Sequence, residues 1–503
     1  MSRIFDVICN GTPVAHRPWP RFVVDAPGWI GIGEDLADGQ ARLLSLWAEV
    51  GAVHMAVMVP GSSGIAIFTL DCPEGRFPSL GARHAPAIRL ERGIADLFGL
   101  QPVDAPDTRR WLDHGRWGIA HPLARDGGVT PADTTYPFLP AEGPGLHQAA
   151  VGPIHAGIIE PGHFRFTVNG ETVVRLEQRL GYTHKGVDGL MAGAPLDRAA
   201  RLAGRVCGDS TVAYALAFAQ AAEAALEAKV PPRASYLRAL MAELERMANH
   251  LGDIGGICND ASFGLLQAHF AVLREQVLRA AHSCFGHRLM RDGILPGGVA
   301  VDLDDRGAAA LRDLAGFLES RLPALVEIYD ETASLQDRTV GTGILKPALA
   351  RRFGAGGYVG RASGHEADAR KTPGYAPYPS LRFDIPMLEA GDVNARAWIR
   401  IREIEQSLLL VRQILDELPG GEIALELPAC AAISEGAALV EGFRGDIFVW
   451  LRLAADGRVE RCHLRDPSWF QWPLLEAAIE GNIIADFPIC NKSFNCAYSG
   501  HDL

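Results

Sequence analysis

The chain has 503 residues, 48% of them hydrophobic, and a formal net charge of -12. This hydrophobic content is ample for packed cores and excludes a mainly disordered chain, and the length suggests roughly two to four domains. The acidic balance argues against nonspecific nucleic-acid binding, which needs a basic surface. The sequence has no run of about 18 apolar residues and no secretory pattern at its start, so we expect a cytoplasmic chain without a transmembrane helix.

The nine cysteines do not form a recognisable framework. None stands in a C-x-x-C pair and their number is odd, so we expect no set of structural disulfides. An iron–sulfur cluster needs about four thiolates at suitable spacing, and the sequence offers no such set. We therefore expect most of these cysteines to be small buried apolar residues.

Residues 1–123 have the pattern of a small α/β domain. Residues 42–48 show helical spacing, and residues 54–59 and 65–70 predict strands joined by a turn at 60–64. The segment ERGIADLFG at 91–99 predicts a helix that ends at Gly99, and DTRR follows at 107–110. Residues 124–145 are rich in Gly, Pro, Thr and Asp, which predicts a linker and a domain boundary.

The larger part of the chain, residues 146–503, begins with loops and a hairpin. GPIH at 152–155 opens a loop, EPGHF at 160–164 leads into a hairpin with the turn signal Asn169-Gly170, and GYTHKG follows at 181–186. Apolar residues at helical spacing then predict a helix bundle over 197–335, with long helices over 263–290 and 305–328. We interpret His250 in this block as a packed core residue rather than a ligand.

The last stretch is the most unusual. After a loop-rich section with GRASG at 360–364, a further helix and a strand at 447–451, the chain ends in an aromatic tail over 466–503. Aromatic side chains at this density are normally buried, whereas chain ends are usually polar and frayed. We expect the tail to enter the core and to meet the segment RVCGDSTVAY at 205–214. The aromatic residues of the tail are Trp469, Phe470, Trp472, Phe487 and Phe494.

These motifs occur in the order found in one family. The chain resembles the catalytic large subunit shared by group 4 membrane-bound nickel–iron hydrogenases, of the formate hydrogenlyase and hydrogenase-4 type, and by the 49 kDa subunit of respiratory complex I. Residues 91–110 resemble the 30 kDa subunit of complex I, with Gly93 in place of a glutamate. The resemblance implies an α+β fold: a 30 kDa-like α/β domain over 1–123, a linker over 124–145, and over 146–503 a hydrogenase-like helix bundle with peripheral antiparallel β-sheets.

In the hydrogenases of this family, two C-x-x-C pairs hold nickel and iron. The matching positions here are Cys207, Ser210, Ala497 and Gly500, so one of the four thiols remains. Alanine and glycine carry no donor atom and a serine hydroxyl is a poor ligand for these metals, so we expect no nickel–iron centre. Cys496, one place before a matching position, would raise the number of thiolates to two at most.

The resemblance to complex I implies a different use of the same place. There, a quinone head group lies between a histidine-bearing loop and a tyrosine, and His155 and Tyr214 match these positions. We predict that both bind quinone and transfer protons during its reduction. Two observations oppose this prediction. Ile159 stands where complex I has its second histidine, and Tyr214 could be an ordinary packed tyrosine with one satisfied hydroxyl.

Further polar residues lie in the matched motifs. We expect Glu160 and Asp502 to act with Tyr214 and His155 as catalytic groups, and Cys207 and Arg444 to line the cofactor pocket. Buried charges must be paired, so a network of salt bridges would account for most of the other polar positions. Arg361 and Arg444 are also candidates for such core ion pairs.

Three functions are compatible with the sequence. We favour an oxidoreductase subunit of the NADH dehydrogenase, quinone or hydrogenase-like type that lacks nickel and acts only within a complex. Its expected partners are a small iron–sulfur subunit, which carries the clusters, and antiporter-like membrane subunits that hold it at the inner face of the cell membrane; nucleic acid is not among them. Quinone is the one candidate ligand of this chain. The alternatives are a non-catalytic scaffold and a working hydrogenase.

Overall fold

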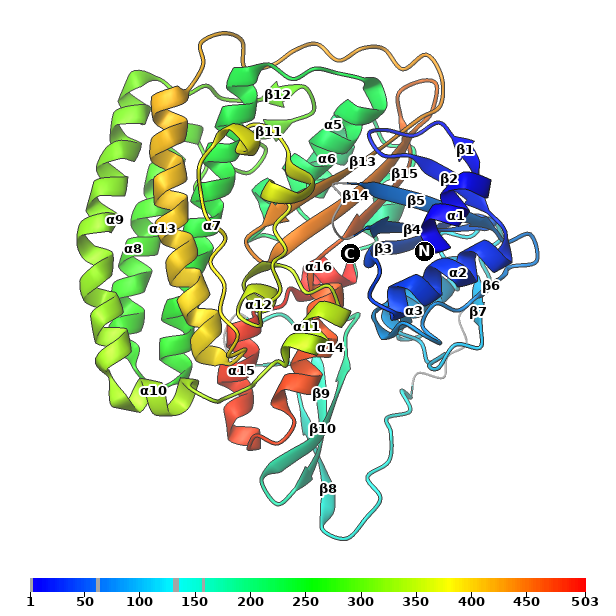
Figure 1. The fold of residues 1–503 in the computed structure, drawn as a ribbon, viewed down its shortest axis with the longest axis horizontal. Coiled ribbons are helices and arrows are strands. Elements are labelled where there is room, and N and C mark those ends of the chain that lie inside the picture. Colours follow the sequence, from blue (N-terminus) through cyan, green and yellow to red (C-terminus); the bar gives the residue numbers. More distant parts are fainter. Residues whose placement is uncertain (1–2, 60–63, 130–134, 156–158) are drawn as a thin grey trace.

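The computed structural model describes residues 3–59, 64–129, 135–155 and 159–503. A sheet built from the first strands lies on one side, a bundle of long helices lies on the other, and the C-terminal tail lies between them (Figure 1). Helices dominate the chain and the sheets are small and mostly antiparallel, so the predicted α+β class is confirmed.

The N-terminal sheet has the strand order β1-β2-β5-β4-β3. Helices α2 and α3 pack on one of its faces, and the strands β13 and β14 pack on the other. A short parallel pair, β6 and β7, lies beside it. The bounds of these elements are α1 Arg3–Asn10, β1 Thr12–Val14, β2 Arg21–Val24, α2 Ala26–Ala37, β3 Arg42–Glu49, β4 Ala52–Met58, β5 Ile65–Asp71, β6 Arg76–Pro78, α3 Ile88–Phe98 and β7 Gln101–Val103.

One element of this region was predicted wrongly. Residues 42–48 form strand β3, paired with β4, and not a helix. The strand is covered on both faces: Leu43 and Leu46 pack towards the helices, and Leu44 and Trp47 pack towards β13 and β14. Burial on both faces removes the alternation of polar and apolar residues that marks a strand. The strands predicted at 54–59 and 65–70 are confirmed, whereas residues 60–63 of the predicted turn lie outside the described part of the chain.

The helix predicted at 91–99 is confirmed as α3. It ends where Gly99 adopts a left-handed conformation with φ of 73°, which glycine adopts without steric cost. The carboxylate of Asp96 on this helix accepts the backbone N–H groups of Trp111, Leu112 and Asp113, and so fixes the turn that follows DTRR. In the described residues between 104 and 145 there is no regular helix or strand, and the linker over 124–145 stays a prediction.

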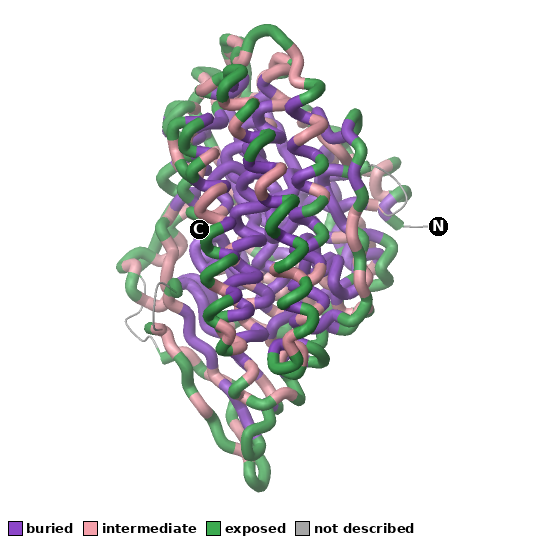
Figure 2. The backbone as a smooth tube through the Cα atoms, turned by 90° about the vertical axis from the view of Figure 1, so that its left-hand side faces the viewer, coloured by how far each residue is buried: buried purple, intermediate pink, exposed green. Residues whose placement is uncertain are grey.

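The predicted hairpin is confirmed, with its turn one residue later than expected. Strands β8 Leu146–Val151, β9 His163–Asn169 and β10 Thr172–Arg179 form one antiparallel sheet. Asn169 pairs with Thr172, so Gly170 and Glu171 make the turn. This hairpin extends away from the body of the molecule, with an exposed tip (Figures 1 and 2).

Four long helices, α7, α8, α9 and α13, form the bundle, and their inward faces are buried while their outward turns are exposed (Figure 2). The helices predicted at 263–290 and 305–328 correspond to α8 and α9. Asp392 caps the start of α13 by accepting the N–H of Ala395 at 2.7 Å. The bounds are α4 Val187–Met191, α5 Leu196–Ala203, α6 Thr211–Leu226, α7 Pro232–Asp260, α8 Gly264–Phe285, β11 Ile294–Leu295, β12 Gly298–Val299, α9 Asp305–Glu331, α10 Ala333–Thr339, α11 Pro347–Arg352, α12 Gly357–Arg361 and α13 Val393–Glu417.

The chain ends with a three-stranded antiparallel sheet and the tail. All five tail aromatics are at most 6% exposed, so their predicted burial is confirmed. Trp472 and Phe494 are fully buried, in the core that the tail shares with the N-terminal sheet. The bounds are β13 Ser434–Gly442, β14 Gly445–Leu453, β15 Val459–Arg465, α14 Ser468–Ile479, α15 Phe487–Phe494 and α16 Tyr498–Asp502; single helical turns lie at Ala85–Ala87, Arg370–Gly374, Tyr378–Ser380 and Ile484–Asp486.

Candidate functional site

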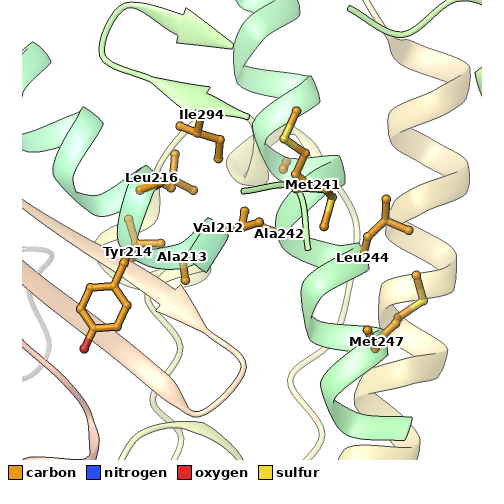
Figure 3. Close-up of a cluster of buried hydrophobic side chains, with 14 of the residues drawn as sticks. Val212, Ala213, Tyr214, Leu216, Met241, Ala242, Leu244, Met247 and Ile294 are labelled. Atoms are coloured by element: carbon orange, nitrogen blue, oxygen red, sulfur yellow. The ribbon is translucent and has the colours of Figure 1, made fainter. Parts of the chain in front are cut away.

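The segment at 205–214 and the tail meet, as predicted. Tyr214, on the first turn of α6, donates its hydroxyl proton to Asp466 Oδ2 at 2.6 Å, and Asp466 lies directly before α14. Its ring points away from the apolar cluster that contains Leu216 and Met241 (Figure 3). The second oxygen of Asp466 accepts the N–H of Ser468 at 2.8 Å. Both Tyr214 and Asp466 are buried, so this hydrogen bond is shielded from water.

Arg444 joins the two segments with its guanidinium group. This residue lies in the turn between β13 and β14 and donates to both oxygens of Asp209, at 2.7 and 2.5 Å. It also contacts Ser210 Oγ at 3.3 Å and Cys207 Sγ at 3.7 Å. On the tail side it donates to the carbonyl of Asn495 at 2.5 Å. A fixed positive charge therefore lies against Cys207 and Ser210, the two positions that match the first C-x-x-C pair of the hydrogenases.

Cys207 is held as a thiol. Its Sγ donates to Asp209 Oδ1 at 2.8 Å. Burial raises the pKa of Cys207 well above its usual range, and the Asp209 carboxylate raises it further. Burial alone would also raise the pKa of Asp209, but the Arg444 guanidinium outweighs it and lowers the value. A metal needs the thiolate, which this arrangement disfavours.

The four positions do not fit a nickel–iron centre. Ser210 and Ala497 are buried, and a Cβ atom at Gly500 would overlap Asp466 Oδ2 and lie 2.8 Å from its Cγ. Burial also raises the pKa of Cys496, so this thiol is no better a ligand than Cys207. Within the described ranges no group of three or more His, Cys, Asp or Glu side chains is arranged to hold a metal ion.

Glu160 contacts the tail directly, and His155 lies on the neighbouring loop, bonded to Gly162. The His155 ring bonds through Nε2 to the carbonyl of Gly162 at 2.8 Å, and exposed Glu160 accepts the N–H of Ser499 at 3.0 Å. A Cβ atom at Gly162 would overlap the ring of Tyr498, so Tyr498 fills the space beside this loop. Helix α16 thus contacts the His155 loop near its start and Asp466 at Gly500. That His155 and Tyr214 line one cavity stays a prediction.

Asp502 is the centre of a hydrogen-bond network at the end of the tail. Its Oδ2 accepts the backbone N–H and the hydroxyl of Thr183, at 2.9 and 2.7 Å. Its Oδ1 lies 2.8 Å from Nδ1 of His501, whose Nε2 accepts the Trp111 indole N–H at 3.2 Å. The imidazole is therefore neutral and donates from Nδ1. Burial lowers the pKa of His501, which keeps it in this form.

Three residues of this site were not singled out from the sequence. Asp209 and Asp466 hold the protons of Cys207 and Tyr214, and Lys185 donates to the carbonyl of Ser499 at 3.1 Å. Lys185 is exposed and faces the charges of Glu160, Asp466 and Asp502, so the buried network reaches the surface here. Lys185 could have been found because it lies in the GYTHKG motif, whereas no spacing signal distinguishes Asp466 from other tail residues.

Family models match most of the chain in three parts. Residues 48–132 match the 30 kDa subunit of the respiratory-chain NADH dehydrogenase, and residues 263–435 match its 49 kDa subunit. Between them, residues 185–252, which include Cys207 and Tyr214, match the nickel-dependent hydrogenases.

Individual proteins are similar over much of the chain. Formate hydrogenlyase subunit 5 of Escherichia coli is 31% identical over 86% of this chain and 78% of its own length. Hydrogenase-4 component G of the same organism is 30% identical over 90% and 80%. An NADH-quinone oxidoreductase subunit of Dehalococcoides mccartyi is 30% identical over 67% and 92%.

A solved structure has a similar fold. One chain of the membrane-bound sulfane sulfur reductase, an archaeal respiratory membrane complex, matches with a TM-score of 0.67 and 26% identity. The match covers 71% of this chain and 98% of the other. In the described part of the present chain, no helix is both long and apolar enough to span a bilayer.

Proposed function

Because the chain belongs to the oxidoreductase family of large subunits shared by membrane-bound hydrogenases and NADH-quinone oxidoreductases, we propose that it works without nickel in a membrane-associated redox complex. One observation carries this proposal. The Arg444 guanidinium, a cation that proteins do not deprotonate, bonds to Asp209, Ser210 and the carbonyl of Asn495. A metal ion at the same place would meet this positive charge with one thiol available.

The chemistry proposed for the remaining groups is proton transfer coupled to electron transfer. Electrons would come from a small iron–sulfur partner subunit. Reduction of a quinone to a quinol takes two electrons and two protons, and the Tyr214 hydroxyl is a proton donor already bonded to a carboxylate. Asp502 with His501, and Glu160 with Lys185 nearby, would link this donor to the surface. His155 is proposed as the second quinone contact.

The attachment to the membrane is proposed through partners. The relatives named above include subunits of membrane respiratory complexes, and we propose that this chain lies at the inner face of the cell membrane on antiporter-like subunits.

A non-catalytic scaffold is the second candidate, and a specific contact favours it. Tyr498 packs against Gly162 beside the His155 loop, and Tyr214 already donates its proton to Asp466. A quinone head group would have to displace part of the tail to reach the Tyr214 hydroxyl, because that hydroxyl is fully buried. If the tail never moves, these residues only hold the two segments together.

Metal analysis tests the absence of nickel. We expect the purified complex to contain no stoichiometric nickel, because the donor set is one protonated thiol and the cation position is taken by Arg444. A homologous hydrogenase large subunit, purified in the same way, provides the positive control. About one nickel per chain would overturn this part of the proposal.

The variant Tyr214→Phe separates proton transfer from scaffolding. Loss of a positioned proton donor typically costs about 10²- to 10⁴-fold in rate, so we expect quinone-linked turnover to fall while the complex still assembles. Tyr236→Phe, on α7, is the matched control, since its hydroxyl is bonded only to Ser380 at 3.4 Å among the described residues. Unchanged turnover in Tyr214→Phe would remove this residue from the mechanism and favour the scaffold.

A further inference from the structure

A second polar site lies where strand β10 ends, beside Thr183, which bonds to Asp502 of the tail. A cavity of about 220 Å³ opens there, and the described residues that line it carry aromatic or basic side chains. This volume is below the roughly 300–1,000 Å³ of pockets for drug-sized ligands, so the enclosed part of a ligand must be small. The lining residues are His114, Arg116, Tyr136, Phe138, His163, Arg179 and Tyr182.

Arg179 is the residue that indicates a bound ligand. It is the last residue of β10 and is 4% exposed, yet no carboxylate of the described residues lies within ion-pair distance of it. Its guanidinium donates to the carbonyls of Arg110, Trp111 and Asp113 and stacks on Tyr136 at 4.5 Å. Buried charges are normally paired, and the carboxylate that acts on the charge of Arg179 is Asp96, which lies behind the same turn and outside the cavity lining.

The surroundings add positive charge and hydrogen-bond donors. Arg116 is exposed at the cavity and makes no ion pair within the described ranges, and Arg165 stacks on Phe138 at 4.6 Å, also without a carboxylate partner there. The hydroxyl of Tyr136 accepts from Arg92 at 2.8 Å, so its own proton is free to be donated. Tyr182 contributes a second hydroxyl, and burial raises its pKa, which keeps it protonated.

We infer that this cavity binds a phosphate group. One guanidinium fork satisfies a planar carboxylate, whereas donors that approach from several sides suit the oxygens of a tetrahedral phosphate. Arg179 reaches it from the inside, Arg116 from the surface, and the tyrosine hydroxyls from the walls. The phosphate belongs either to a free anion or to the head group of an anionic lipid. The cavity adjoins the tail network at Tyr182, next to Thr183, but its binding of phosphate does not depend on the proposed function.

The test uses the full chain and two probes. Inorganic phosphate is titrated at constant ionic strength against chloride, with binding followed by phosphorus NMR, and vesicles with and without phosphatidylglycerol are tested by co-flotation. Loss of one charge-assisted contact should weaken binding roughly tenfold or more, so we expect this in Arg116→Gln. Tyr182→Phe should weaken binding by a smaller factor. Both side chains reach the surface, so neither change removes a buried ion pair.

Arg125→Gln is the control, because Arg125 is exposed on the same segment but lies outside the cavity lining. Its binding should equal that of the unmodified chain. Binding of inorganic phosphate identifies a free-anion site, and binding of the anionic vesicles alone identifies a lipid head-group site; both support a phosphate site if Arg116→Gln weakens them. Absence of binding to both probes, or equal binding by Arg116→Gln and Arg125→Gln, would overturn the inference.

Discussion

Two buried clusters of charged residues differ in the groups that contact their carboxylates. The bundle cluster lies among the helices and every one of its four carboxylates contacts a guanidinium. In the tail cluster, Asp209 alone of three carboxylates does so within the described ranges. The bundle cluster is Glu243, Arg246, Arg361, Asp368, Arg370, Glu403 and Glu441; the tail cluster is Cys207, Asp209, Tyr214, Arg444, Asp466, His501 and Asp502.

The two clusters differ in how many of their carboxylates are fixed by a permanent charge. A guanidinium does not release its proton under physiological conditions, so its pairs in the bundle cluster are structural, although Glu243 also accepts the Tyr378 hydroxyl and Glu403 also bonds to His250. The thiol, phenol and imidazole of the tail cluster carry protons that can move, and each is bonded to a carboxylate. The bundle cluster is also sealed, whereas the tail cluster reaches the surface at partly exposed Asp209.

The largest expected effect is that of removing the tail, which eliminates one half of the tail cluster. A chain that ends before Trp469 should not fold cooperatively. Each fully buried apolar side chain contributes roughly 1.5–3 kcal/mol, and the five tail aromatics together would exceed a typical stability of about 5–15 kcal/mol once their neighbours are counted. Circular dichroism during thermal unfolding measures this. A soluble truncated chain with a cooperative transition would contradict it.

A smaller effect is expected from breaking the bundle cluster. Arg361→Met leaves Glu403, Asp368 and Glu441 short of a partner, which should cost about 3–5 kcal/mol in the free energy of unfolding. Arg412→Met is the control, because its pair with Glu319 is largely exposed and should contribute about 0–1 kcal/mol. Urea denaturation of both variants gives the comparison. Equal losses would mean that the bundle cluster does not support the fold.

The smallest effect concerns pH, and it tests whether a buried carboxyl group outside both clusters titrates above its usual range. Glu245, on α7, accepts the N–H groups of Val212 and Ala213, which directly precede Tyr214, and burial raises its pKa to about 8. The folded chain therefore binds more protons than the unfolded chain between about pH 4.5 and 8, and its stability should fall as the pH rises through this window.

Glu245→Gln should flatten this decline by roughly 1–3 kcal/mol between pH 5 and 8. Part of the slope will remain, because burial also raises the pKa of Glu441, to about 7. Exposed Glu327→Gln on α9 is the control and should leave the slope unchanged. Denaturation midpoints measured at several pH values decide the matter, and identical slopes for all three proteins would show that Glu245 titrates normally.

The elements that could be predicted were those with local signals. Strands β4 and β5 were predicted from short apolar runs bounded by turn residues, and the end of α3 was predicted from its glycine. Each of these signals depends only on neighbouring residues. Strand β3 was missed because its burial on both faces depends on β13 and β14, about 400 residues later in the chain. The periodicity of a short segment carries no information about contacts with residues so distant in the sequence.

The candidate site shows the same limit. The meeting of Tyr214 with the tail followed from aromatic residues that needed a core, and this prediction is confirmed. That Asp466 accepts the tyrosine proton, and that Arg444 turns its guanidinium onto Asp209, depends on side-chain directions within a folded turn. Residue types at a given spacing do not determine those directions.

The position of Asp466 leaves no room for a side chain at Gly500. Any side chain placed there meets Asp466, which cannot swing aside because Tyr214 and the N–H of Ser468 hold both of its oxygens. The single substitution Gly500→Cys should therefore strain the chain, because its Cβ atom would overlap Asp466. A cysteine at position 500 requires a smaller residue in place of Asp466, and Tyr214 then loses its hydrogen-bond acceptor. A side chain at position 500 is therefore compatible with this fold only together with a smaller residue at position 466.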